Sequence, residues 1–235
     1  MAIPAEHQEY MTSLKDWLNS EESKPLEEMD AFFTKRLAGY EEHMLEHWAF
    51  GYEYLAKLIP DTAVNILDLG CGTGLELDEL FKLRTDVKVT GIDLSENMIG
   101  ELKRKHADKD ITLICGSYFD EPFPQSMDAV ISFESLHHFT PAEKLPLFKK
   151  ICESLKEGGI FMNGDYFACC DEEEVLLRET CDRRRLKQNI PAGQFVHFDT
   201  PLTAEHEMQL LREAGFREVY VDSTPEASPI VIAKK

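Results

Sequence analysis

A chain of 235 residues, 43% of them hydrophobic, is long enough to bury a sizeable core and suits one α/β domain with an appendage. No stretch approaches the roughly 20 consecutive apolar residues that span a bilayer, and the segment from Met1 to His7 lacks the pattern of a signal peptide. The formal net charge of −19 makes nucleic acid an unfavourable partner, because phosphate backbones would be repelled.

The six cysteines include no C-x-x-C pair, and several lie in apolar runs. This usage is typical of reduced cysteines in the cytoplasm, so we expect a cytoplasmic protein without disulfides. We also predict no metal site. The adjacent Cys169 and Cys170 are interpreted as ordinary residues in a loop or at a helix start. A thiophilic ligand such as arsenite is the alternative interpretation of this pair.

The first 60 residues are predicted to form a helical cap. Apolar residues recur at spacings of three and four from Met29 to Ile59, as on one face of a helix. Gly39 and Gly51 are expected to interrupt this stripe, which favours two or three helices over one.

From Val64 onward, short apolar runs alternate with amphipathic stretches, and residues 61–235 are predicted to form the second domain. The runs suit buried parallel strands. They are Val64–Leu69, Val87–Ile92, Ile111–Cys115, Ala129–Phe133 and Ile160–Asn163. A capping box at Thr140 predicts a helix start, and Gly158-Gly159 is expected to end that helix. The alternation indicates a doubly wound, mostly parallel sheet.

The C-terminal pattern is different. A helix is predicted from Thr203 to Ala214, with Gly215 ending it. Two strands follow, Glu218–Asp222 and Pro229–Ala233, and the short link between them is too short for a parallel crossover. They are therefore predicted to form an antiparallel hairpin that completes a seven-stranded α/β sheet.

A glycine-rich turn lies between the first predicted strand and the next helix. Its sequence, Gly70-Cys71-Gly72-Thr73-Gly74, has the spacing G-x-G-x-G and not the G-x-G-x-x-G of dinucleotide sites. Glycine allows close backbone approach to a ligand, and the helix start offers unpaired N–H groups. Asp93 ends the second strand about 20 residues later, where a carboxylate can accept hydrogen bonds from both ribose hydroxyls. A helix cap is the alternative role of Asp93.

These segments resemble class I methyltransferases that depend on S-adenosyl-L-methionine (SAM). The resemblance rests on Ile66–Gly74, on Gly91–Met98, on Met127–Phe139 and on Leu155–Gly159, in the family's usual order, and covers about Tyr40 to Lys235. It implies the Rossmann-like fold, methyltransferase activity, SAM as cofactor and S-adenosyl-L-homocysteine as product.

The resemblance also implies a role for individual residues in binding SAM. Gly70, Cys71 and Gly72 would cradle the methionine part, Asp68 would hold the loop or the amino group, and Asp93 would bind the ribose. The adenine would lie near Leu94, Met98, Ser117 and Tyr118, although many relatives have aspartate where Ser117 stands. Phe133 and Glu134 would line the methionine end, and Tyr40 would close over the cofactor.

Methyl transfer from a sulfonium is an in-line displacement, so the protein chiefly orients the reactants and excludes water. A general base is needed only if the acceptor must lose a proton. His137, His138 and Asp165 are the predicted catalytic residues because they follow the fourth and fifth strands, at the edge where such sheets bind ligands. Packing or capping is the alternative role of all three, and His197 is a weaker candidate.

The acceptor is predicted to be a small molecule, held between the N-terminal helices and an insert at about residues 166–200. Aromatic residues in this insert indicate a closed cavity. The basic run Arg183–Lys187 is interpreted as a solvated helix face that balances Asp171–Glu174. Two alternatives are an RNA-modifying enzyme of the tRNA wobble-uridine type and a non-catalytic SAM-binding protein. The sequence predicts neither the acceptor's identity nor the oligomeric state.

Overall fold

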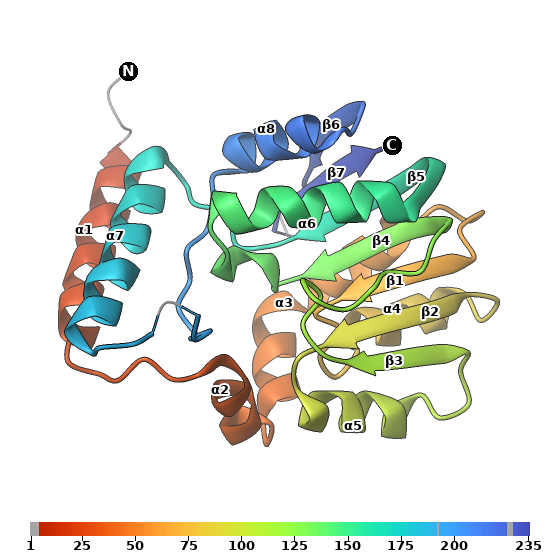
Figure 1. Ribbon diagram of the computed structural model, residues 1–235, viewed down its shortest axis with the longest axis horizontal. Coiled ribbons are helices and arrows are strands. Elements are labelled where there is room, and N and C mark those ends of the chain that lie inside the picture. Colours follow the sequence, from red (N-terminus) through yellow and green to blue (C-terminus); the bar gives the residue numbers. More distant parts are fainter. Residues whose placement is uncertain (1–4, 192, 225–227) are drawn as a thin grey trace.

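The computed structural model describes residues 5–191, 193–224 and 228–235 (Figure 1). Two predictions concern segments that lie partly outside these described residues. Residues 1–4, part of the N-terminal segment without a signal-peptide pattern, lie outside the described residues, and so do residues 225–227 in the link between the last two strands. No helix among the described residues is long and apolar enough to cross a membrane.

A single seven-stranded sheet forms the centre of the molecule, with the strand order β3-β2-β1-β4-β5-β7-β6. The strands are β1 Asn65–Leu69, β2 Lys88–Asp93, β3 Ile111–Cys115, β4 Met127–Phe133, β5 Leu155–Gly164, β6 Glu218–Asp222 and β7 Ile230–Lys234. The first five are parallel, while β7 runs antiparallel to both β5 and β6. The predicted doubly wound sheet with a C-terminal antiparallel hairpin is therefore confirmed.

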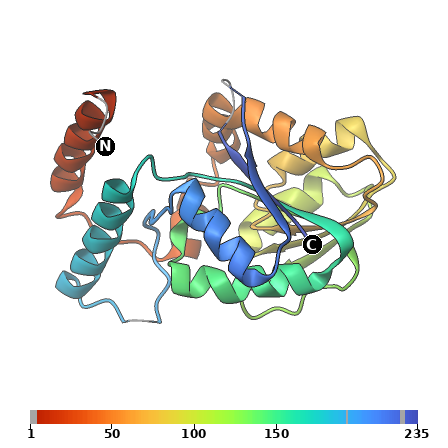
Figure 2. The same cartoon turned by 90° about the horizontal axis from the view of Figure 1, so that it is seen from above.

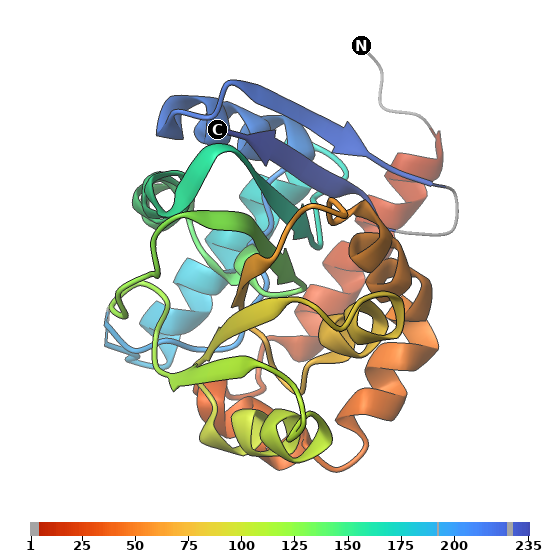
Figure 3. The same cartoon turned by 90° about the vertical axis from the view of Figure 1, so that its right-hand side faces the viewer.

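Helices cover both faces of the sheet (Figures 2 and 3). One face carries α3 Tyr40–Leu58, α4 Leu75–Leu83 and α5 Glu96–Lys105, whose apolar residues form one core with β1 and β2. The other face carries α6 Pro141–Ser154 and α8 Ala204–Ala214, which bury Phe148 and Leu211 in a second core. The capping box predicted at Thr140 is present. A 3₁₀ turn at Leu136–His138 follows β4.

Three helices lie beyond the carboxyl edge of the parallel strands. Figure 1 shows α1 Ala5–Glu21 beside α7 Asp171–Lys187, and Leu18 of α1 packs with Leu177 of α7 and Phe198. The backbone N–H of Met29, at the start of α2 Met29–Arg36, donates to the Phe195 carbonyl at 3.1 Å. Helices α1 and α2 and the insert after β5 therefore form one unit. In contrast, α3 packs directly on the sheet.

Two predicted helix boundaries are wrong. Gly51 does not interrupt α3, although Gly39 does separate α2 from α3 in a left-handed conformation. A Cβ on Gly51 would lie 2.6 Å from the Phe133 ring. Glycine at this position therefore lets α3 pack closely against Phe133 of β4 and does not break the helix. The helix α6 ends at Ser154, before Gly158, because β5 already begins at Leu155 and pairs with Met127.

Candidate active site

The glycine turn connects β1 to α4 at the carboxyl edge of the sheet. Gly70 and Gly72 have φ angles of 76° and 48°, which residues with a side chain rarely adopt. A Cβ on Gly70 would lie 2.1 Å from Ser135 Oγ, so the backbone here passes unusually close to the segment after β4. Glycine is required at position 70 both by its dihedral angle and by this contact.

Asp93, at the end of β2, is fixed to the glycine turn. Its Oδ2 accepts the backbone N–H of Gly72 at 2.9 Å, and its Oδ1 accepts that of Ser95 at 2.8 Å. Burial raises the pKa of Asp93, while these two backbone hydrogen bonds counteract the increase. A carboxylate has about four acceptor positions, so these bonds leave acceptor capacity for a ligand.

Asp68, in the strand before this turn, and Cys71, within it, do not line the cavity described below. Asp68 is fully buried, and neither carboxylate oxygen has a hydrogen-bond donor among the described residues. Burial and the neighbouring carboxyl of Glu76 raise the pKa of Asp68 well above its usual value. The Cys71 side chain packs against Gly91, where a Cβ would lie 2.8 Å from Cys71 Sγ.

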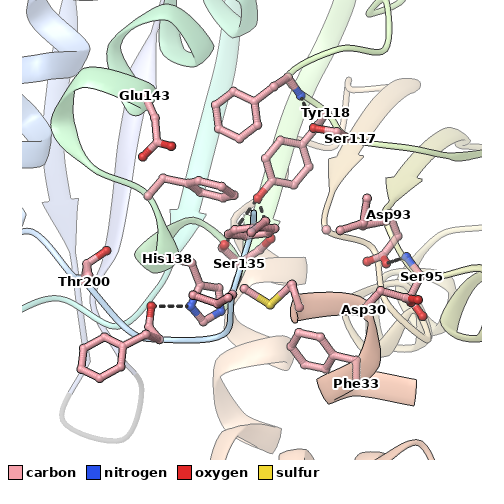
Figure 4. Close-up of a pocket in the computed structure, with 18 of the residues that line it drawn as sticks. Asp30, Phe33, Asp93, Ser95, Ser117, Tyr118, Ser135, His138, Glu143 and Thr200 are labelled. Atoms are coloured by element: carbon pink, nitrogen blue, oxygen red, sulfur yellow. Dashed lines mark hydrogen bonds between the residues drawn. The ribbon is translucent and has the colours of Figure 1, made fainter. Parts of the chain in front are cut away.

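A cavity of about 570 Å³ extends from the glycine turn to the insert (Figure 4). Ten of the twelve residues predicted to bind the cofactor line it. They are Tyr40, Gly70, Gly72, Asp93, Leu94, Met98, Ser117, Tyr118, Phe133 and Glu134. The predicted roles of these residues are not tested by this placement, but the structure brings the ten together.

The other end of the cavity is largely aromatic. Phe139 stacks on Phe195 of the insert with ring centroids 4.9 Å apart, and Phe198 also lines the wall. Phe33 of α2 also lines the cavity, near Asp30 and in ring contact with Tyr40 (Figure 4). Charged groups of both signs complete this end of the cavity: Arg178, Arg185, Glu143 and Asp182.

The predicted catalytic residues lie together at the cavity wall. His137 Nδ1 is 2.6 Å from Asp165 Oδ1, and both side chains are buried behind the lining. His138 lines the cavity directly. Asp199 of the insert reaches both rings, with its Oδ1 3.5 Å from His137 Nε2 and 3.3 Å from His138 Nδ1.

A buried polar chain supports Asp165 from behind. Asn163 Nδ2 donates to Asp165 Oδ2 at 3.3 Å and to Glu207 Oε1 at 2.7 Å. Lys144 Nζ donates to the other oxygen of Glu207 at 2.6 Å. These side chains connect β5 with α6 and α8, so the orientation of Asp165 is fixed by the core.

The electrostatics of the cluster favour positive charge at His137. Burial alone would lower the pKa of His137, but the carboxylates of Asp165 and Asp199 raise it well above its ordinary value. The pKa of His138 is lowered by burial and by the neighbouring His137. The pKa of Glu134 is raised to about 8, mainly by burial, although His137 opposes this increase.

His197 and the basic run Arg183–Lys187 lie elsewhere in the insert. His197, the weaker catalytic candidate, stacks on Phe32 with ring centroids 3.5 Å apart, and burial lowers its pKa to about 4. The run Arg183–Lys187 is solvated only in part, and the charges that balance it differ from the predicted Asp171–Glu174. Arg183 and Lys187 pair with Glu22, and Arg184 is buried with its guanidinium on the Lys24 carbonyl.

The cysteine pair lies where one interpretation placed it. Cys170 directly precedes α7, and the two sulfurs are 3.8 Å apart. The backbone N–H of Cys169 donates to Glu173 Oε2 at 2.6 Å. Burial and Glu173 raise the pKa of the Cys169 thiol, which disfavours the reactive thiolate form.

Sequence reasoning missed several residues of the site. Asp199, Asn163, Glu207 and Glu76 were not singled out, because each lies in a segment without a recognisable motif. The available signal was polarity in an apolar context: Asn163 stands in the apolar strand β5, and Asp199 follows Phe198 in the aromatic part of the insert. That signal identifies unusual residues but not their partners.

Comparison with known proteins gives the family. Residues 66–159 match the methyltransferase domain family. The chain is 30% identical over 179 residues to a carboxy-S-adenosyl-L-methionine synthase of Campylobacter curvus, covering 71% of this chain and 75% of the relative. The counterpart in Campylobacter fetus is 37% identical over 114 residues, and there the match spans about half of each chain, 48%.

Solved structures share the fold. Human N-acetylserotonin methyltransferase in complex with SAM superposes with a TM-score of 0.62 at 22% identity, covering 83% of this chain and 54% of that chain. A SAM-dependent methyltransferase from Mesorhizobium loti gives a TM-score of 0.59 at 20% identity, covering 77% and 96%. The chain belongs to the class I SAM-dependent methyltransferase family, and it is an enzyme of that family.

Proposed function

We propose that this enzyme transfers a methyl group from SAM to a small-molecule acceptor. The observation that carries the proposal is the single cavity that connects the glycine turn to the aromatic end under α2 and the insert. Such a cavity can hold both reactants in line and keep water away from the sulfonium.

The residues around the glycine turn suit SAM. Asp93 has free acceptor positions for ribose hydroxyls, and Met98, Leu94 and Tyr118 offer apolar surface for the adenine. Asp68 is buried behind this lining beside Glu76, and its predicted role is to hold the glycine turn or the amino group of the methionine part. When bound, SAM supplies an activated methyl group, and the chain's own residues orient it.

The acceptor would occupy the aromatic end of the cavity. Phe139, Phe195 and Phe198 give an apolar wall, so the acceptor has an apolar or aromatic body. His138 lies at this wall, where it would contact the group that receives the methyl, and His137 and Asp165 lie behind it. Their catalytic role stays a prediction.

The test is an untargeted assay in which the purified enzyme, methyl-labelled SAM and a metabolite extract are incubated together. We expect label in one small compound and formation of S-adenosyl-L-homocysteine. Label that appears only in the RNA fraction would contradict the proposal, and tight SAM binding without labelled product would favour a non-catalytic SAM-binding protein. Arg183 and Lys187 pair with Glu22 and do not line the cavity, which supports a small-molecule acceptor over the RNA alternative.

A second candidate function is the synthesis of a carboxylated SAM derivative. It is suggested by the two relatives from Campylobacter, which are named as carboxy-S-adenosyl-L-methionine synthases. Arg178 and Arg185 line the cavity, and guanidinium groups suit a carboxylate-bearing reactant. Mass spectrometry of SAM incubated with the enzyme and a carboxylic acid pool would distinguish the two. A SAM derivative heavier by one carbon dioxide unit would favour the second candidate, and a methylated acceptor the first.

A further inference from the structure

His137, His138 and Asp199 present three ligand atoms that all lie within 4.8 Å of one another. We propose that these three side chains bind a divalent transition-metal ion such as Zn²⁺ at the acceptor end of the cavity. Two imidazoles and one carboxylate form a known ligand set for catalytic zinc and for non-haem iron. The sequence predicted no metal site, because His137-His138 and Asp199 belong to distant segments.

Two of the three spacings between the ligand atoms suit a tetrahedral ion. Metal–ligand distances of roughly 2.0–2.2 Å place neighbouring ligand atoms about 3.3–3.5 Å apart. Asp199 Oδ1 lies 3.5 Å from His137 Nε2 and 3.3 Å from His138 Nδ1. This oxygen is buried, and its contacts with the two rings are long for hydrogen bonds.

His137 also has the partner that a metal-bound histidine needs. Its Nδ1 is held by Asp165 at 2.6 Å, which leaves Nε2 directed at Asp199. A carboxylate on the distal nitrogen fixes the tautomer and orientation of a metal ligand. Asn163 in turn holds Asp165, so this support extends into the core.

The charge around the cluster favours a cation. Glu134 Oε2 lies 4.0 Å from His137, so three carboxylates surround one buried imidazole. The positive charge of His137 compensates these carboxyl groups only in part, and a divalent ion bound at Nε2 in place of its proton would add to that compensation. Metal binding at His138 Nδ1 would break one existing contact. This nitrogen lies 3.3 Å from the Phe198 carbonyl, a long hydrogen bond (Figure 4).

Only three protein ligands are proposed, which leaves a coordination position for another molecule. His138 and Thr200 line the cavity, so an ion held there would meet the acceptor (Figure 4). The suggestion that the ion binds the acceptor's heteroatom rests on the proposed function. The binding of the ion itself does not.

The test is calorimetric titration of the chelator-treated full-length protein with Zn²⁺. We expect one equivalent to bind, with Asp199→Asn weakening the affinity at least tenfold and Asp165→Asn by about 10–100-fold. The matched control is His47→Ala. His47 belongs to an exposed group on α3, His43-Glu46-His47, that could also hold an ion, and its removal should leave the affinity unchanged.

Binding of less than half an equivalent, or an affinity unaffected by Asp199→Asn, would overturn the proposal. Loss of binding in His47→Ala would assign the ion to α3 and overturn it equally. Should Asp199→Asn not fold, His138→Gln tests the same ligand set. Thermal stabilisation by SAM is measured in parallel on every variant, so failure of the metal site and failure of SAM binding are distinguishable.

Discussion

Asp93 shows how one side chain connects the motif to the ligand. Its carboxylate is positioned by the backbone N–H groups of Gly72 and Ser95, so its geometry is set by the turn before any ligand arrives. Preorganisation of this kind reduces the conformational cost of binding. Asp68 is the contrasting case, since it is buried without a donor and depends on a ligand or on Glu76.

We expect Asp93→Ala to weaken SAM binding more than tenfold, which corresponds to about 1.4 kcal/mol or more, because paired hydroxyl contacts are lost. Calorimetric titration with SAM measures the change. Asp110→Ala is the matched control, since this exposed aspartate lies outside the cavity lining and its removal changes the net charge equally. An unchanged affinity in Asp93→Ala would remove this residue from the site.

Helix α3 shows that a glycine inside an element can serve packing. Gly51 lies against the ring of Phe133, a residue of the cavity wall, so the helix and β4 approach closely. In contrast, Gly100 in α5 has open space around its Cβ position. The same residue type therefore has opposite consequences in two helices.

We expect Gly51→Ala to destabilise the protein by about 1 kcal/mol, because overpacking against Phe133 costs roughly 1–3 kcal/mol and better helix propensity returns only about 1. Gly100→Ala should stabilise it by about 0.5–1 kcal/mol. Urea denaturation of both variants measures the free energies of unfolding. Equal stabilisation in the two variants would show that Phe133 adjusts without cost.

The contact between α1 and α7 depends on Glu173. Its carboxylate accepts hydrogen bonds from the hydroxyls of Tyr10 and Tyr166 and from the backbone of Cys169. Burial would raise the pKa of Glu173, but these donors outweigh it and the pKa is lowered. Ionised Glu173 therefore stabilises the α1–α7 contact above its unfolded pKa, and this contribution is lost as the pH falls through the folded value.

We expect Glu173→Gln to reduce stability by about 1–3 kcal/mol at pH 7, because hydrogen bonds to a charged acceptor are lost. The difference between variant and wild type should shrink as the pH is lowered from roughly 4.5, the range in which the unfolded state takes up the proton. Denaturation midpoints across this pH range provide the measurement. A difference that is constant with pH would assign the effect to packing.

At the scale of the whole molecule, one cavity unites segments from most of the chain. The glycine turn, the segment after β4, α2 and the insert all contribute to its wall. Ligand binding to such a cavity favours the folded state by mass action. The size of the stabilisation therefore reports on which ligands fit.

We expect SAM and S-adenosyl-L-homocysteine at about one hundred times their Kd to raise the melting temperature by about 5–10 °C. This follows from a linkage of roughly 2.7 kcal/mol and from about 2–4 °C per kcal/mol for a protein of this size. NAD at the same concentration should give a much smaller shift. Differential scanning fluorimetry compares the three, and no shift with either adenosyl ligand would contradict SAM binding.

The sequence by itself determined the sheet, its C-terminal hairpin and most of the residues that line the cavity around the glycine turn. These features depend on local patterns: buried strands are apolar, the turn needs glycine, and Asp93 follows its strand directly. Only the tertiary structure decided which polar residues meet, because Asp199 reaches His137 and His138 from a distant segment. It also decided that Gly51 serves packing and that α1 covers α7, since both depend on contacts between elements that no local pattern records.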